Sequence, residues 1–157
     1  MFAVLKTKND GGGGSNTDGF LQLMGSGAGD WWPYSTSALI GFGASSGWWG
    51  NFDPSPDISV FHIYGSTAIV NNGYIYVDDV ELVHATSLTV GWASAPHICY
   101  NSSGGYKWNN KIAELIYLDY VPTTTERNKI CGYLAWKWGT VSRLDSGHPY
   151  KNAAPLQ

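Results

Sequence analysis

Residues 111–151 read KIAELIYLDYVPTTTERNKICGYLAWKWGTVSRLDSGHPYK, and the rest of the fold can be built outward from them. The first part predicts a strand, because apolar side chains fill both of its alternating sets. One set is Ile112, Ile116 and Leu118, and the other is Ala113, Leu115 and Tyr117. A strand that is apolar on both faces is typical of the interior of a sandwich, since neither face is left in water.

A helix over residues 124–138 follows the strand, and its two ends can be read from the sequence. Thr123 is the predicted N-cap, and Glu126, three residues later, completes a capping box. Gly139 provides the C-terminal stop. One helical stripe is predicted to pack on the sheet, and it contains Arg127, Ile130, Leu134 and Trp138, widened by Cys131 and Tyr133. Trp136 falls nearly opposite, where we expect it to contact the C-terminal tail in preference to a partner surface.

Composition excludes several classes of protein. A chain of 157 residues suits a single domain spanning residues 1–157. Charged residues make up 13% and aromatic residues 15%, with nine Lys and Arg against twelve Asp and Glu, so we expect neither disorder nor nucleic-acid binding. We also expect no membrane span, because no apolar run has the required length. The start, MFAVLK, lacks the pattern of a signal peptide, so export uses another route or does not occur. Cys99 and Cys131 are expected to be unpaired thiols in preference to a disulfide.

The remainder of the chain alternates short strand-like runs with turn-rich stretches. The expected strands are residues 2–6, 20–24, 38–42, 58–64, 87–92 and 97–100, together with two strands within 74–83 that turn at Asp78-Asp79. Many short strands at near-regular spacing, with one late helix, indicate an all-β antiparallel sandwich.

The closing stretch resembles the C-terminal signature of concanavalin A-like (laminin G-like) jelly-roll domains, which occur in bacteriophage structural proteins and bacterial surface proteins. The runs that carry the resemblance are Ile112–Glu114, Glu126–Arg127, Gly132–Ala135, Lys137–Gly139 and His148–Tyr150. FAVLK at 2–6 resembles the family's mid-domain strand. IYVDDVELV at 75–83 resembles its hairpin, with Asp79 in place of a more usual glycine. The resemblance implies an antiparallel jelly-roll β-sandwich with one C-terminal helix.

One departure from the family concerns the sheet edge. Family members have a further segment before the strand at 2–6, and its strands pair with the last ones. A bare edge would expose unpaired backbone groups and invite association. Three alternatives follow: the remaining part of a longer chain covers the edge, another virion subunit covers it, or the domain is a minimal variant.

For each residue that could act as a catalyst, we favour a structural role over a catalytic one. Glu114, between Ile112 and Ile116 on one face, could be a buried general acid with a raised pKa. The glucanase relatives of this fold need two carboxylates on one strand, and no second one lies two or four residues away. We therefore favour a structural Glu114 bonded to Arg127, Lys137 or a tryptophan N–H. For Asp78 and Asp79, a solvated hairpin tip is favoured over a catalytic dyad.

Metal binding is not supported by the spacing. His62, His84, His97 and His148 are scattered. His62 is expected to pack or hydrogen-bond within the sheet, and His148 to lock the tail onto the domain beside Tyr150. A G-x-S-x-G motif is absent. Asn51, Asp53 and Asp57 could provide oxygen ligands for calcium, but their spacing matches no EF-type loop. These residues are more simply explained as turn residues. We expect no metal and no cofactor.

Aromatic residues in Gly/Ser-rich stretches are the remaining lead. They are Trp31, Trp32, Tyr34, Trp48 and Trp49, and they are predicted to lie outside the strands. Indole rings can stack on sugars or anchor a protein interface. The alternative is that they fold back to seal the ends of the sandwich, and we expect some of each.

The function can only be approached by analogy, because a fold does not fix a function. Resemblance to the phage-associated branch implies a virion surface module without enzyme activity, made in the host cytoplasm. Such a capsid decoration or tail-fibre protein would adhere to glycans or contact neighbouring subunits. The alternative is an extracellular carbohydrate-binding module or adhesin fragment of a larger secreted bacterial protein. A glycoside hydrolase is a third, disfavoured class.

Overall fold

The computed structural model is mostly β, with antiparallel sheets and one helix in the residues it describes. These are residues 1–8, 19–24, 30–34, 39–44, 47–52, 57–87, 89–90, 92–101, 106–107 and 110–156. Side chains are described for 1–8, 57–87, 89–90, 97–99 and 110–156. The glycine-rich stretch at 9–19 is expected to be a loop and 102–105 a turn; residues 9–18 and 102–105 lie outside these ranges, and Gly19 begins a strand.

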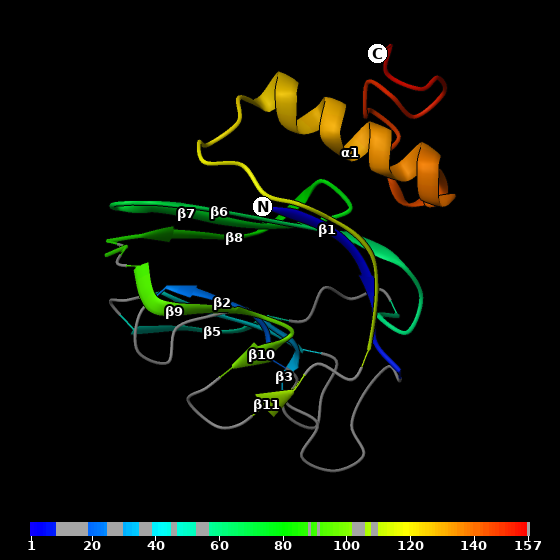
Figure 1. The fold of residues 1–157 in the computed structure, drawn as a ribbon. Helices are drawn as coiled ribbons and strands as arrows, with labels where there is room; N and C mark the ends of the chain where they lie inside the picture. Colours follow the sequence, from blue (N-terminus) through cyan, green and yellow to red (C-terminus); the bar gives the residue numbers. More distant parts are fainter. Residues whose placement is uncertain are drawn as a thin grey trace.

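The first sheet has five antiparallel strands in the order β12-β1-β6-β7-β8. Their bounds are β1 Phe2–Lys6, β6 His62–Ile69, β7 Asn72–Val77, β8 Val80–Thr86 and β12 Lys111–Ile116. Helix α1 (Thr124–Trp138) and the short helix η1 (Val141–Arg143) lie over one face of this sheet (Figure 1). The helix therefore closes the same sheet that contains the strand leading to it.

The second sheet lies on the side of the first sheet away from α1 (Figure 1). Its strands are also antiparallel and follow the order β5-β4-β3-β2-β9. Their bounds are β2 Gly19–Met24, β3 Asp30–Tyr34, β4 Leu39–Ala44, β5 Gly47–Phe52 and β9 Trp92–Ile98. A separate two-stranded ribbon joins β10 (Tyr100–Asn101) to β11 (Tyr106–Lys107).

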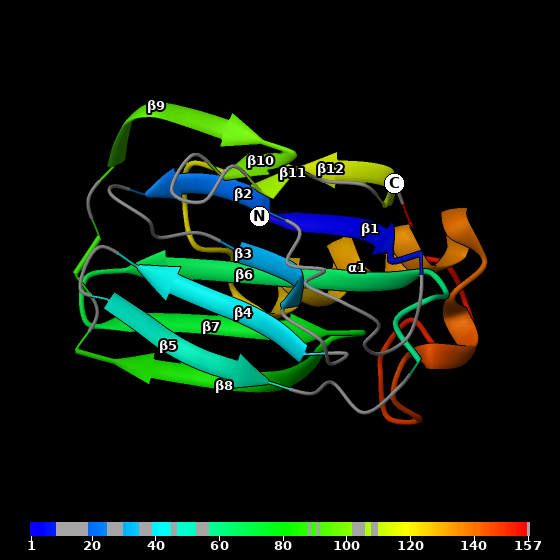
Figure 2. The same ribbon diagram turned by 90° about the horizontal axis from the view of Figure 1, so that it is seen from below.

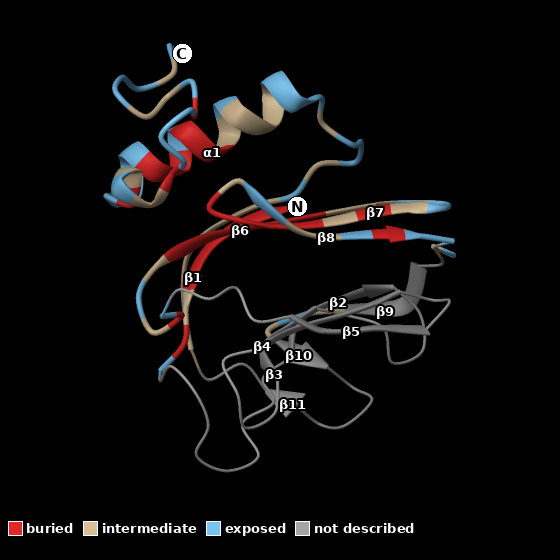
Figure 3. Cartoon of the chain, turned by 180° about the vertical axis from the view of Figure 1, so that it is seen from behind, coloured by how far each residue is buried: buried red, intermediate tan, exposed pale blue. Residues whose placement is uncertain are grey.

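The central strands of the first sheet are buried on both faces, whereas β8 at its edge is largely exposed. Strand β1 shows this, because Ala3 and Leu5 join a cluster with Tyr64 and Ile75, whereas Phe2 and Val4 face α1. The cluster under the helix contains Phe2, Val4, Ile63, Cys131, Leu134, Ala135 and Leu144. Figure 3 shows the buried segments of β1 and β6 in red, facing the buried middle of α1. Each large apolar side chain buried there contributes about 1.5–3 kcal/mol, so this contact anchors the helix.

Strand β12 contains a bulge that the predicted alternation missed. Val4 pairs with Glu114, but Leu5 pairs with Ile112, so one extra residue is inserted at Ala113. Ile112 and Leu115 pack on the cluster beneath the sheet, while Ala113, Ile116 and Leu118 pack under the helix. The prediction that Ile112 and Ile116 share one face of the strand is therefore wrong. The bulge redirects the following side chain, so Glu114 contacts α1.

Both predicted ends of α1 are confirmed. Thr123 and Glu126 form the full capping box, and Gly139 has φ 70° with its N–H bonded to Ala135 O. The predicted stripe needs correction, because Trp138 is 39% exposed. The face of α1 turned to the sheet is centred on the buried residues Cys131, Leu134 and Ala135. Trp138 lies beside this face, where its indole N–H donates to Glu114 on β12.

Several strand boundaries differ from the prediction. The strand expected at 58–64 begins only at His62, because the Asp57 carboxylate accepts the Ser59 N–H and starts a turn. Ile58 instead accepts the Thr7 N–H through its carbonyl oxygen. Strand β9 runs from Trp92 to Ile98 and β10 begins at Tyr100, so the strand expected at 97–100 is divided between the two. The strand expected at 87–92 meets β9 only at Trp92, and residues 88 and 91 lie outside the described ranges. The strands expected at 2–6, 20–24 and 38–42 and the hairpin in 74–83 are confirmed, with small shifts at their ends.

No helix within the described ranges combines the length and the apolar character that crossing a membrane requires.

Candidate functional site: a buried charged turn and two aromatic strands

The turn between β7 and β8 is buried, which corrects the expectation of a solvated hairpin tip. Asp78 and Asp79 both adopt left-handed backbone, with φ 53° and 67°. Short polar side chains such as Asp tolerate this conformation better than most residues. The turn lies beneath α1 and the C-terminal segment, and Asp78 is 6% exposed. Two carboxylates are therefore withdrawn from water and need partners.

Asp78 holds the sheet side of this turn. Its Oδ1 accepts the Ile63 N–H at 3.0 Å, and its Oδ2 lies 2.6 Å from His62 Nδ1. His62 Nε2 lies 2.8 Å from the Asp57 carbonyl oxygen. Because a carbonyl oxygen only accepts, Nε2 carries a proton, and a second proton must lie between Nδ1 and the Asp78 carboxyl group. The expected hydrogen bonding of His62 within the sheet is confirmed.

Asp79 holds the helix side. Its Oδ1 accepts from Arg127 Nε at 2.7 Å, and the guanidinium group lies 4.3 Å from the centre of the Tyr76 ring. The Asn128 side-chain amide, oriented with its nitrogen towards Asp79, donates to Asp79 Oδ2 at 3.0 Å. Burial lowers the pKa of Arg127, but Asp79 and Tyr76 together raise that pKa by more, so the guanidinium stays charged. Asp79 in the β7–β8 turn thus fixes the N-terminal part of α1 to the sheet.

His148 adds the C-terminal tail, which we define as residues 145–156, to the same turn. Its Nε2 lies 3.4 Å from Asp79 Oδ2, at ion-pair distance but without hydrogen-bond alignment. Its Nδ1 accepts the Tyr150 N–H at 3.1 Å. Burial lowers the pKa of His148, and Asp79 only partly offsets this, so the imidazole is neutral at neutral pH. The expectation that His148 locks the tail onto the domain is confirmed.

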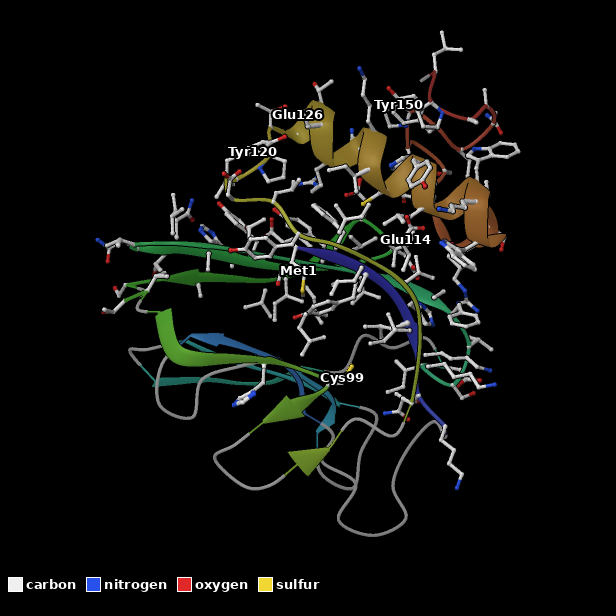
Figure 4. All side chains as sticks on the ribbon, in the orientation of Figure 1. Met1, Cys99, Glu114, Tyr120, Glu126 and Tyr150 are labelled. Atoms are coloured by element: carbon white, nitrogen blue, oxygen red, sulfur yellow. The ribbon has the colours of Figure 1, made fainter. Side chains whose placement is uncertain are left out.

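Tyr150 and Trp136 complete the attachment of the tail. The Tyr150 ring lies against Gly132, and Trp136 Nε1 donates to the Tyr150 carbonyl oxygen at 2.9 Å. The predicted contact of Trp136 with the tail is therefore confirmed. Figure 4 shows Tyr150 beside α1 on the tail side and Glu114 on the sheet side.

Glu114 is bound by three donors from the last turns of α1. Its Oε2 accepts from Trp138 Nε1 at 2.6 Å, and its Oε1 accepts from Lys137 Nζ at 3.2 Å and Tyr133 OH at 3.3 Å. Burial raises the pKa of Glu114, but the bonds from Trp138 and Lys137 lower it by more, so the net shift is downward. A general acid needs the opposite shift. The predicted bonds of Glu114 to Lys137 and to a tryptophan N–H are confirmed, and the predicted bond to Arg127 is wrong, because Arg127 binds Asp79.

The chemistry open to these groups is limited. Asp78, Asp79 and Glu114 are each engaged by donors, and burial raises the pKa of the Cys131 thiol well above its usual value. Such a thiol is a poor nucleophile. Cys99 and Cys131 are both free, as expected. Among the described residues no group of three or more His, Cys, Asp or Glu is placed to hold a metal ion. Of the considered calcium ligands, Asp53 lies outside these residues and the Asp57 carboxylate caps Ser59.

The predicted contact aromatics lie in strands, which corrects their assignment to loops. Trp31, Trp32 and Tyr34 belong to β3, and Trp48 and Trp49 belong to β5. These strands flank β4, where Trp31 pairs with Gly41 and Trp48 with Gly43 (Figure 2). The two tryptophan pairs, separated in sequence, therefore lie on the two strands that flank β4. The rings themselves fall outside the described side chains.

Sequence reasoning missed the role of the Asp78-Asp79 turn. The available signal was its composition, because two adjacent carboxylates stand out in a chain with 13% charged residues.

Comparison with protein-family models, with curated protein sequences and with solved structures yields no match.

Proposed function

We propose that this chain is a concanavalin A-like jelly-roll β-sandwich that acts, without catalysis, on the surface of a bacteriophage virion. It would serve as a capsid decoration or a tail-fibre module that adheres to glycans, contacts neighbouring subunits, or does both. The resemblance of residues 111–151 supports the class of fold. The contacts described above add to it, because the signature residues each have a structural partner and so need no catalytic role.

The observation that carries the proposal is the placement of the tryptophans on β3 and β5. Strand β5 is an end strand of its sheet in the described part of the chain, and β4 between them supplies glycines at the paired positions. Glycine presents no side chain that would compete for space with a neighbouring aromatic ring. Indole rings carried by these two strands would suit stacking on sugar rings or anchoring a protein partner.

The absence of catalysis is supported by Glu114. A retaining or inverting glycosidase needs one carboxyl group that is protonated and a second one across the scissile bond. Glu114 has a lowered pKa and spends its two oxygens on Trp138, Lys137 and Tyr133. Its replacement by glutamine is therefore expected to change stability and not turnover.

Subunit contacts are supported by the edge of the first sheet at β12. In the described ranges β12 pairs only with β1, and the residues that follow it expose apolar side chains. These are Tyr117, Tyr120 and Val121. A strand edge flanked by exposed aromatic residues is suited to association with another subunit or with the rest of a longer chain.

The glycan part is tested by electrophoresis through gels that contain a soluble polysaccharide, using a panel of bacterial cell-surface polysaccharides. The variants are Trp31→Ala and Trp48→Ala, and the matched control is Trp136→Ala on the half-exposed side of α1. We expect at least one polysaccharide to retard the wild type and the control but not the two strand variants. Retardation by none of them, or equal retardation of all four proteins, would reject glycan adhesion through β3 and β5.

The subunit part is tested by analytical ultracentrifugation of the wild type and of Tyr120→Lys, alone and mixed with disassembled capsid or tail proteins of the encoding phage. We expect association that the charged variant weakens. A wild type that sediments as a monomer in every mixture would reject it. If the chain binds polysaccharide but no virion component, the hypothesis of a secreted carbohydrate-binding module replaces that of a virion surface module.

A further inference from the structure

The attachment of the tail includes one group, the His148 imidazole, that can take up a proton. Three contacts join the tail to α1 and to the β7–β8 turn beneath it: the His148 imidazole near Asp79, the Tyr150 ring on Gly132, and the Tyr150 carbonyl oxygen that accepts from Trp136. The tail is also tied to η1 separately, because Lys151 Nζ donates to three backbone carbonyl oxygens. These belong to Val141, Ser142 and Leu144.

The hydrogen bonds of His148 fix where its proton lies. Nδ1 accepts the Tyr150 N–H, so it cannot carry a proton in this arrangement. Nε2 therefore carries the proton of the neutral ring. A second proton on Nδ1 would set two donors against each other and break the bond to Tyr150. Because Tyr150 also provides the carbonyl oxygen for Trp136 and the ring on Gly132, one protonation strains all three tail contacts.

The charges around His148 do not favour a cation at this place. Asp79 faces it from the β7–β8 turn, but Arg127 from α1 already occupies that carboxylate at 2.7 Å. Within the tail, Asp145 attracts a cationic ring and Lys151 repels it. The His148 side chain is itself only 3% exposed, so it has little water to stabilise a charge. Consistently, burial holds the pKa of His148 below its usual value of 6.5.

We infer that the tail is a proton-sensitive clasp, in which protonation of His148 releases residues 145–156 from α1 while the helix stays docked. The helix keeps its place because its contacts with the sheet do not depend on His148. Arg127 binds Asp79 directly, and Leu134 and Ala135 of α1 are buried against the sheet. Release returns the imidazole to water, where it takes up a proton more readily, so acidification shifts the equilibrium towards the open tail.

Two indole N–H groups on the same helix provide the test. Trp136 Nε1 reports on the tail through Tyr150, whereas Trp138 Nε1 reports on the sheet through Glu114, which has a lowered pKa and stays ionised in mild acid. Nuclear magnetic resonance spectra of ¹⁵N-labelled protein would follow both signals from about pH 7.5 to about pH 5, a range that spans the usual titration of His. The variants Trp136→Phe and Trp138→Phe assign them.

We expect the Trp136 signal to move towards the position of a solvent-exposed indole as the pH falls, with the Trp138 signal unchanged. In His148→Asn, the Asn oxygen can still accept the Tyr150 N–H but takes up no proton, so the Trp136 signal should stay fixed. A wild-type Trp136 signal that does not move, or that moves together with Trp138, would overturn the inference. So would an equal movement in His148→Asn.

Discussion

Gly132 lies directly against Tyr150, eighteen residues later in the chain. A Cβ atom built at Gly132 would come within 2.6 Å of Tyr150 Cβ and 2.9 Å of its ring. Glycine inside a helix costs about 1 kcal/mol relative to alanine. The close approach of the tail explains why the helix nevertheless has a glycine at this place, and it links the GYLA and HPY parts of the closing sequence.

Gly132→Ala is predicted to destabilise the protein by about 1–3 kcal/mol, the usual cost of overpacking, despite the better helix propensity of alanine. The clash is with Cβ and ring carbons of Tyr150, which cannot move without releasing the tail. Urea unfolding measures the loss, and the Trp136 indole signal should shift at the same time. Unchanged stability together with an unshifted signal would contradict the packing.

Gly139→Ala serves as the comparison and has a different cause. Gly139 has φ 70°, and nothing lies within 4 Å of a Cβ built there. The predicted loss is about 1–2 kcal/mol from backbone strain alone, and the Trp136 signal should keep its position. Gly139→Asn should lose less, since Asn tolerates the left-handed region.

Thr123→Ala is predicted to lower the free energy of unfolding by about 1 kcal/mol, because it removes the N-cap of α1. Thr123 Oγ1 accepts the Glu126 N–H at 3.3 Å, and the Glu126 carboxylate accepts the Thr123 N–H at 2.8 Å. Thr123→Ser keeps both bonds and is the matched control. Equal losses in the two variants would show that the hydroxyl group does not cap the helix.

Glu114→Gln tests the charge beneath the last turn of α1. The pKa of Glu114 in the folded protein lies below the usual 4.5, so its contribution to stability is present above pH 4.5 and is lost as the pH falls through the lower folded value. We predict a loss on the order of 1 kcal/mol at neutral pH, moderated by partial exposure to solvent, that shrinks as the solution is acidified.

The control for this variant is Glu81→Gln, which removes the same charge from an exposed position on β8. Chemical denaturation at several pH values compares the two. If Glu114→Gln is as stable as the wild type at neutral pH, or if its deficit grows in acid, the assigned hydrogen bonds are wrong.

Features that depend on neighbouring residues could be predicted from the sequence. The ends of α1 are such features, because Thr123, Glu126 and Gly139 act within one turn of the backbone that they cap. The hairpin turn at Asp78-Asp79 was located for the same reason. The structural role of Glu114 could also be anticipated, since the strand offered no second carboxylate.

Features that depend on distant partners could not be predicted. The bulge at Ala113 exists only in the pairing of β12 with β1, and it decides which face Glu114 occupies. Burial of the Asp78-Asp79 turn requires Arg127 and His148 to arrive from the far end of the chain. The tryptophans of β3 and β5 seemed to lie in loops because of the surrounding glycines, whereas Gly41 and Gly43 are their paired positions on β4.

The β7–β8 turn joins the sheet to the helix through the ion pair of Asp79 with Arg127. The most direct test is a double-mutant cycle with Asp79→Asn, which suits the left-handed backbone, and Arg127→Met, which keeps much of the apolar stem. Free energies of unfolding are measured for the four proteins by urea denaturation. We predict that each single variant loses several kcal/mol, because the other charge is left buried, with a coupling energy of about 1–3 kcal/mol. Losses that add to within about 0.5 kcal/mol would contradict the claim.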